Sequence, residues 1–413
     1  SAKASSADTN LNFTLLADAD LREAKQKFTA QLNLKHANLK VLNFSETELA
    51  VSTQLTARAN YSGLQDADAH LALSDAKLIR PYRTVPLTSV VMQGRSAPDS
   101  LQFEIKSDII DGSVFGNITP ENLGRTLQSA YKKYFGIYDT TQSIAGKHIA
   151  FNMNVHIPAE ITQLFSPESE ALNISHLKGS YKTDDNELLV EMQLPEALYS
   201  GIKLDSLKLS VEGENENLSL LASLSEVAYD TLKIENIRIN EKVDKGIIRS
   251  EISTLDSTGK PSYLFVNKIE SDSGFFRLSF LPGGLILDNT SWQVGEGNRL
   301  EKQEDRWITE QFIFSHNDQS AGFVTDETSQ KIVFNNFGLQ NLLNILSSSG
   351  NKRLFKGDLN GEVVFPVSES EKFIDATLSV NQLYILDTLI GHVFARVKTN
   401  SDSLQLTFTL ANE

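Results

Sequence analysis

The chain has 413 residues, of which 40% are hydrophobic and 22% are charged, a composition typical of folded protein with a sizeable core. Its formal net charge is −15 and it has no block of basic residues, which argues against nucleic acid as a partner because phosphate contacts need clustered Lys and Arg. There are no cysteines, which excludes thiol catalysis, Cys-ligated zinc and disulfides. No apolar run reaches the roughly 18–20 residues that a membrane-spanning helix needs.

Alternation of apolar and polar residues is the main structural signal along the chain. In chain order it occurs in Phe13–Leu15, Leu32–Leu34, Leu49–Leu55, Leu101–Ile105, Phe151–Ile157, Leu207–Val211, Leu232–Ile239, Phe373–Val380 and, most strictly, Leu404–Leu410. A period of two gives each strand one apolar and one polar face, as in a half-buried antiparallel sheet. Polar stretches such as Asp184–Asn186, Gly213–Asn217 and Asn400–Asp402 predict hairpin turns between sequential strands. The pattern therefore predicts an all-β fold built on an elongated antiparallel sheet.

A short repeat accompanies this alternation. An Asp, then Ser or Thr, then Leu precedes a strand-like segment at Asp99, Asp205, Asp230 and Asp402. Each copy alone is explained by the preference of Asp and Ser for turns, so only the recurrence is informative. It favours a meander of unequal strands.

Three segments depart from the β pattern and predict short helices near residues 119–135, 158–165 and 337–347. Pro120 suits the first helical position, and Gly136 suits the end of the first helix. We interpret these helices as covers for sheet ends rather than as binding elements. No Pro- or Gly-rich linker divides the chain, so residues 1–413 are interpreted as one continuous β-groove segment.

Catalytic and metal-binding motifs are absent from the sequence. There is no nucleophile elbow, phosphate-binding loop, dinucleotide fingerprint or His-Glu-x-x-His motif. His148 and His156 could share a sheet face but have no partner at ligand spacing. Trp292 and Trp307 are interpreted as packing residues. We therefore expect a non-enzymatic protein without cofactor or metal.

The last part of the chain carries a succession of four motifs, in the order Asn336–Leu346, Phe355–Val363, Phe373–Leu386 and Ile390–Val397. This succession resembles the AsmA-like family and, within it, the TamB group (translocation and assembly module B). The pattern of that group is a Leu-rich helix, a Gly-x-Leu-x-Gly strand, a strand ending in an apolar cluster, and Leu-Gly before another strand. Gly357–Gly361 matches the second motif, and Ile390-Gly391 stands where Leu-Gly is usual. Residues 119–135 and 157–179 resemble the pattern more weakly.

The resemblance implies a curved, taco-shaped antiparallel sheet with an apolar inner surface in the periplasm of a Gram-negative bacterium. It implies that the parent protein is anchored in the inner membrane by an N-terminal helix, and that a region outside this fragment meets an outer-membrane β-barrel partner. The function expected from it is bridge-like transport of phospholipid between the two membranes. Acyl chains would gain about 0.8 kcal/mol for each buried CH₂ on such a surface.

Eight apolar residues in the best-matching region are the candidates for the lipid-contacting surface. They are Leu378, Val380, Val393, Ala395, Val397, Leu404, Leu406 and Phe408. The ordinary alternative is that they form the core of a β-sandwich. Two other functions remain open from the residues: a scaffold that assists assembly of outer-membrane β-barrel proteins, and an adhesin, which would need longer recognition loops.

Overall fold

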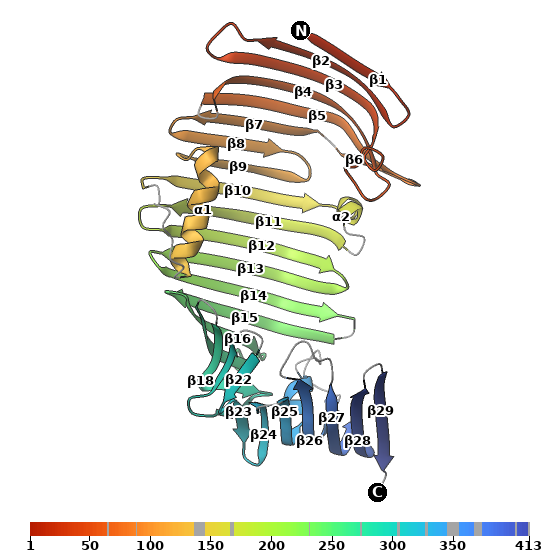
Figure 1. Cartoon of the computed structure of the whole chain (residues 1–413), viewed down its shortest axis with the longest axis vertical. Coiled ribbons are helices and arrows are strands. Elements are labelled where there is room, and N and C mark those ends of the chain that lie inside the picture. The colour runs from red at the N-terminus through yellow and green to blue at the C-terminus, as the bar shows by residue number, and fades with distance from the viewer. Residues whose placement is uncertain are drawn as a thin grey trace. The chain divides into compact units, whose positions relative to one another are not determined.

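The structure is a computed structural model that describes residues 1–63, 66–87, 89–135, 145–165, 169–230, 232–272, 275–303, 306–326, 329–344, 355–366, 374–400 and 403–411. About 75% of the chain is strand and 6% is helix, well above the 20–25% strand of an ordinary globular protein. All pairings given by the strand registers are antiparallel, and neither sheet closes into a barrel. The predicted fold class, all-β with long, curved antiparallel sheet and a few short helices, is confirmed (Figure 1).

The strands form a 21-stranded sheet and an 8-stranded sheet. The larger sheet contains β1 (Ala2–Ala7), β2 (Leu11–Asp20), β3 (Gln26–Asn38), β4 (Ala50–Gly63), β5 (Asp66–Arg80), β6 (Arg83–Leu87), β7 (Val90–Ala97), β8 (Ser100–Lys106), β9 (Ile110–Gly116), β10 (His148–Ile157), β11 (Ser169–Lys182), β12 (Glu187–Tyr199), β13 (Ile202–Glu214), β14 (Asn217–Tyr229), β15 (Leu232–Asp244), β16 (Ile247–Leu255), β17 (Pro261–Asp272), β18 (Phe275–Leu287), β19 (Thr290–Ser291), β21 (Arg299–Gln303) and β22 (Arg306–Glu310). The smaller sheet contains β20 (Gln293–Val294), β23 (Ile313–His316), β24 (Gln319–Thr325), β25 (Ser329–Gly338), β26 (Phe355–Pro366), β27 (Asp375–Ile385), β28 (Thr388–Asn400) and β29 (Ser403–Ala411).

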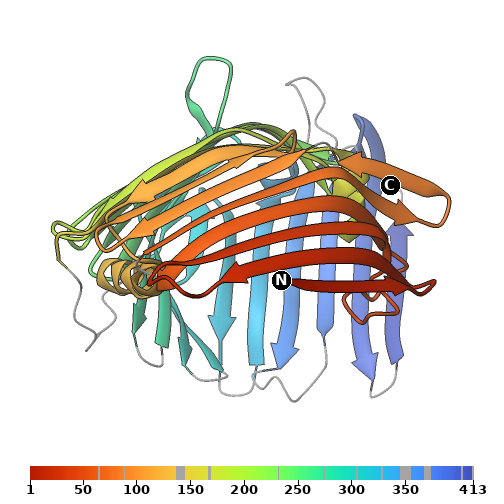
Figure 2. The same ribbon diagram turned by 90° about the horizontal axis from the view of Figure 1, so that it is seen from above.

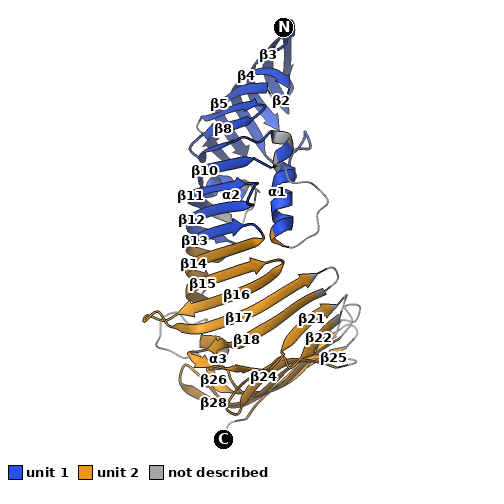
Figure 3. Ribbon diagram, turned by 90° about the vertical axis from the view of Figure 1, so that its left-hand side faces the viewer, with its two compact units in different colours: residues 1–133, 138–201, 207–215 blue, residues 134–137, 202–206, 216–413 orange. Residues whose placement is uncertain are grey.

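The chain divides into two compact units, coloured in Figure 3. Unit 1 comprises residues 1–133, 138–201 and 207–215, and unit 2 comprises residues 134–137, 202–206 and 216–413. Sequence analysis treated residues 1–413 as one continuous groove segment, whereas the strand pairing falls into two sheets. The chain first leaves the larger sheet after β19, where Trp292 is buried in the core and β20 pairs with β23. Strands β21 and β22 return to the larger sheet, and from β23 onward the strands belong to the smaller one.

In unit 1, consecutive strands are mostly neighbours in the sheet, and the strands are strongly curved (Figure 2). Two helices lie at opposite ends of the middle strands: α1 (Pro120–Tyr134) and α2 (Ala159–Phe165) (Figure 1). An ion pair of 3.2 Å between Arg83 and Glu160 joins β6 to α2. Among the described residues of unit 1, no helix lies over the centre of these strands (Figure 1).

The third helix, α3 (Gln340–Leu343), is shorter than the segment 337–347 expected for it. Phe337 belongs to the end of β25 instead of the helix. It is 2% exposed, and its ring packs against Trp292 with 5.3 Å between the ring centroids. Residues 345–347 of the expected helix lie outside the described residues.

Several hairpins turn through two residues that both have positive φ. Examples are Ser200-Gly201 (49° and 78°), Lys245-Gly246 (50° and 80°) and Leu386-Asp387 (50° and 64°). This is the turn whose twist matches that of paired strands, and it explains how long strands follow each other with so few linking residues.

The Asp-Ser/Thr-Leu repeat has a different structural meaning in one copy. Asp99 and Asp230 stand in turns before β8 and β15, as expected, but Asp205 lies inside β13. The interpretation of Asp205 as a turn residue is therefore wrong. Ser206 has a φ of 54° there, so the dipeptide marks an irregularity within a strand instead. Asp402 lies outside the described residues.

Candidate functional site

The registers of unit 1 align apolar side chains in rows that cross the strands, because residues directly opposite each other project from the same face of a sheet. One row runs through Ala2, Ala17, Ala30, Ala57, Leu71, Met92, Ile105, Gly112, Met153, Leu177 and Met192. The parallel row beside it runs through Ala19, Phe28, Ala59, Ala69, Gly94, Phe103, Val114, Phe151, Gly179 and Val190. We call the surface carrying these two rows the apolar face of unit 1.

The opposite face is polar along the same path. The residues that lie in sequence between the members of the two apolar rows project from this opposite face. They are Asp18, Thr29, Arg58, His70, Gln93, Glu104, Ser113, Asn152, Lys178 and Glu191. An ion pair of 2.8 Å between Lys178 and Glu191 lies on this side. The sheet of unit 1 is thus amphipathic across strands β1–β12, and its apolar rows contain no charged side chain.

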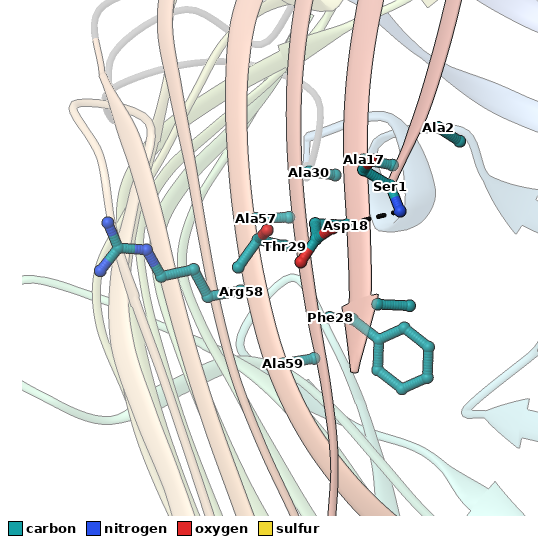
Figure 4. A pocket seen from close by; sticks show the side chains of 11 residues that line it. Ser1, Ala2, Ala17, Asp18, Phe28, Thr29, Ala30, Ala57, Arg58 and Ala59 are labelled. Atoms are coloured by element: carbon teal, nitrogen blue, oxygen red, sulfur yellow. Dashed lines mark ion pairs between the residues drawn. The ribbon is translucent and has the colours of Figure 1, made fainter. Parts of the chain in front are cut away.

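Small side chains make the apolar face hollow near the first strands. A hollow of ≈ 390 Å³ lies over β2–β4, with alanine methyl groups as its floor and Phe28 as a wall. Figure 4 shows Ala30, Ala57 and Phe28 on one side of the sheet, and Arg58 extending away on the other. The larger Met and Phe side chains of β7–β12 replace these alanines farther along both rows. The sequence analysis did not propose this region, although its alanines alternate with polar residues.

All eight residues predicted as the lipid-contacting surface lie on one face of the smaller sheet, in unit 2. Leu378, Ala395 and Phe408 form one row, and Val380 stands opposite Val393 in a second. Val397 stands opposite Leu406 in a third row, and Leu404 extends the face opposite Thr399. We call this surface the apolar face of the smaller sheet.

Exposure along this face is lowest at its β25 end and highest at its β29 end. At its β25 end, Phe334, Phe337 and Leu359 pack with Tyr263, Leu285 and Leu287 from the larger sheet and with Trp292, which lies between β19 and β20. At its β29 end, Leu404, Leu406 and Phe408 are 62%, 63% and 64% exposed. Within unit 2 the face is therefore a closed core at one end and an uncovered apolar surface at the other.

One row of the larger sheet in unit 2 places three polar side chains between apolar ones. Leu220, Glu241, Ser250, Asn267 and Phe280 stand opposite one another on strands β14–β18. Ser250 Oγ donates a hydrogen bond of 2.7 Å to Glu241 Oε1. Burial raises the pKa of the Glu241 carboxyl above its ordinary value, and the hydrogen bond from Ser250 acts in the opposite direction. Sequence reasoning missed this row, because Glu241 looks like any other charged residue near a turn.

The described part of the chain holds no group of three or more His, Asp or Glu side chains placed to share a metal ion. His148 and His156 lie on β10, opposite Lys182 and Asn173 respectively. Among the described helices, none is long and apolar enough to cross a bilayer.

Comparison with known proteins identifies no relative: no family model, curated protein or solved structure matches this chain.

Proposed function

We propose that this chain is a stretch of a periplasmic lipid-transport protein whose apolar sheet faces hold the acyl chains of phospholipids moving between the inner and outer membranes. In this proposal the parent is a TamB-like protein of a Gram-negative bacterium, anchored in the inner membrane. A region outside this chain meets an outer-membrane β-barrel partner, and the transport supports outer-membrane biogenesis.

The observation that supports the proposal is the length of the apolar rows. A row that stays apolar from Ala2 to Met192, with a polar row behind it, offers acyl chains continuous contact and offers no charge to stop them. Contiguous apolar surface of this extent is rarely left on a soluble protein without an interaction partner. Each acyl CH₂ that leaves water on such a surface gains about 0.8 kcal/mol, so a lipid tail needs no specific polar contact.

The eight residues on the smaller sheet fit the same role. Their face is uncovered toward β29, where the side chains of Leu404, Leu406 and Phe408 are exposed. In an ordinary sandwich core the same alternation would be covered along its whole length. The proposal therefore assigns these residues to lipid contact and assigns Phe337 and Trp292 to the closed core.

The direct test is transfer of phospholipid between donor and acceptor vesicles, together with native mass spectrometry of the purified chain. The proposal predicts bound phospholipid and a transfer rate that rises with protein concentration. A chain that purifies without lipid or detergent and leaves transfer at its spontaneous rate contradicts it.

A second candidate function is a scaffold for the assembly of outer-membrane β-barrel proteins. The observation that favours it is β29, which pairs with β28 alone among the described strands and carries no charge or proline. A scaffold would add an incoming strand to this edge. Hydrogen exchange would then show new backbone protection in β29 when a β-barrel peptide is added, without any bound lipid.

A further inference from the structure

Glu241 occupies a position whose equivalent on strand β13 is apolar. The backbone repeats with an offset of 30 residues around it, since positive φ recurs at 200 and 230, at 206 and 236, and at 215 and 245. The aligned sequences share Tyr199 with Tyr229 and Lys203 with Lys233. In this alignment Val211 is the equivalent of Glu241. A carboxyl group at this position is therefore a local departure from the repeat.

The rows on either side of Glu241 are apolar. One contains Leu218, Val243, Ile248, Ile269, Leu278 and Leu300, and the other contains Ala222, Ile239, Ile252, Phe265 and Leu285. None of the residues in these two rows or in the row of Glu241 carries a positive charge. The carboxylate therefore lies among aliphatic and aromatic side chains without a cation in these rows to neutralise it, which is costly unless a ligand supplies one.

The two residues that follow Glu241 across the sheet are buried and polar. Ser250 is 4% exposed and donates its hydroxyl hydrogen to Glu241 Oε1. Asn267 is 8% exposed, and its Oδ1 atom is buried without a hydrogen-bond partner. A buried amide oxygen without a donor is rare in folded proteins and calls for a partner that is not part of the chain. The row thus has acceptors in excess of donors.

From this geometry we propose that Glu241, Ser250 and Asn267 form a binding site for the primary ammonium group of an aminophospholipid. The inference rests on the proposed lipid-transport function and adds a head-group preference to it. A primary ammonium carries one positive charge and three N–H donors, and the row offers a carboxylate and an unpartnered amide oxygen to receive them. The flanking row from Leu218 to Leu300 lies outside the buried cluster around Trp292, so the acyl chains of the same lipid would lie along this row, whereas the other row ends in that cluster at Phe265 and Leu285.

Other head groups match the row less well. A phosphate or carboxylate group would be repelled by Glu241 and would bring no donor to Asn267. A quaternary ammonium has the right charge but no N–H, so it leaves the amide oxygen unpartnered. A sugar or glycerol head group has donors but does not neutralise the carboxylate.

The test is competition between phospholipids that differ only in head group. The full chain is equilibrated with equal amounts of phosphatidylethanolamine, its N-methyl and N,N-dimethyl derivatives, and phosphatidylcholine, all with the same acyl chains, and native mass spectrometry counts each bound species. We expect binding to fall at each methylation step and a preference of roughly tenfold for ethanolamine over choline, the size of a charge-assisted hydrogen bond.

Two variants test whether the head-group preference depends on the row of Glu241. Glu241→Val introduces the residue of the equivalent position 211, and Glu241→Gln keeps the shape of the side chain and guards against a folding defect in the first. Both should bind the four lipids equally while keeping their total lipid content. Glu251→Gln, on the opposite face of β16, is the matched control and should keep the preference.

The outcomes separate this inference from the proposed function. A wild-type chain that binds all four lipids equally, or a preference that survives both Glu241 variants, overturns the head-group site while lipid transport stands. A chain that binds no phospholipid at all contradicts the proposed function itself.

Discussion

Val380 and Val393 stand directly opposite each other in the pairing of β27 with β28, and their side chains project from the same apolar face. They are not equally covered, since Val393 is 7% exposed whereas Val380 is only half-buried. The boundary between the closed core and the uncovered surface of the smaller sheet therefore lies beyond Val393, toward β29, where its partner Leu410 is exposed.

That boundary predicts that a charge introduced on the covered side destabilises the fold much more than the same charge introduced on the uncovered side. Val393→Asp should lower the free energy of unfolding by about 3 kcal/mol or more, because its carboxylate would be buried without a partner. Leu406→Asp, on the same face but 63% exposed, should change stability by about 0.5 kcal/mol or less. Urea unfolding of both variants measures the difference. Equal destabilisation would mean that β29 is as closely packed as β28.

The hollow over β2–β4 predicts a face-specific effect on lipid content. Ala30→Phe should fill the hollow and reduce bound lipid, because Ala30 forms part of its floor. Gln31→Phe adds the same ring one residue later on the opposite face and should leave the lipid content unchanged. Quantitative lipid extraction from both purified variants gives the comparison. If the two variants retain the same amount of lipid, the hollow does not hold acyl chains.

Trp292 should be the largest single contributor to the core of unit 2. It is 1% exposed and packs against Phe337, so Trp292→Ala should cost about 3–5 kcal/mol. Trp307 remains as the fluorescent reporter for denaturant unfolding in this variant. The decrease in the free energy of unfolding should be clearly smaller for Trp307→Phe, because the new ring keeps the edge contact with Phe276. Similar losses in the two variants would argue against a core centred on Trp292.

Gly361 allows a close approach between β26 and β27. Its φ is 120°, and a Cβ atom there would overlap the carbonyl oxygen of Thr377. Gly361→Ala should therefore destabilise the chain by about 1–3 kcal/mol. Gly124→Ala, in a helix position with open space around it, should instead stabilise by up to about 1 kcal/mol. Thermal unfolding of the pair checks the sign, and a neutral Gly361→Ala would show that the strands can separate locally.

The period-two pattern predicted which side of each strand is apolar, because alternation alone assigns the two faces. It placed Leu378, Ala395 and Phe408 on apolar faces of their strands. The hairpins set the register that brings the three residues into one row. It could not predict the change of sheet near Trp292, since this depends on packing between strands distant in sequence. The same limit applies to Asp205, where an Asp-Ser pair occurs inside a strand and has the local composition of a turn.

The row of Glu241 could not be found from the sequence for a related reason. Its partners Ser250 and Asn267 are brought beside it only by the registers of β15, β16 and β17. The 30-residue repeat that exposes the departure from Val211 was also hidden, because few side chains are identical between its copies. Backbone conformation, rather than residue identity, reveals the repeat.

The central claim is that acyl chains contact the apolar rows and not the polar ones. Because the chain has no cysteines, single cysteines can be introduced and labelled with a fluorophore without background. Neighbouring positions on opposite faces form matched pairs: Leu71 with His70, Met153 with Asn152, and Val397 with Arg396. Phospholipids carrying a quencher on the acyl chain should quench the first member of each pair and spare the second. Equal quenching within the pairs, or none at any position, would contradict the account.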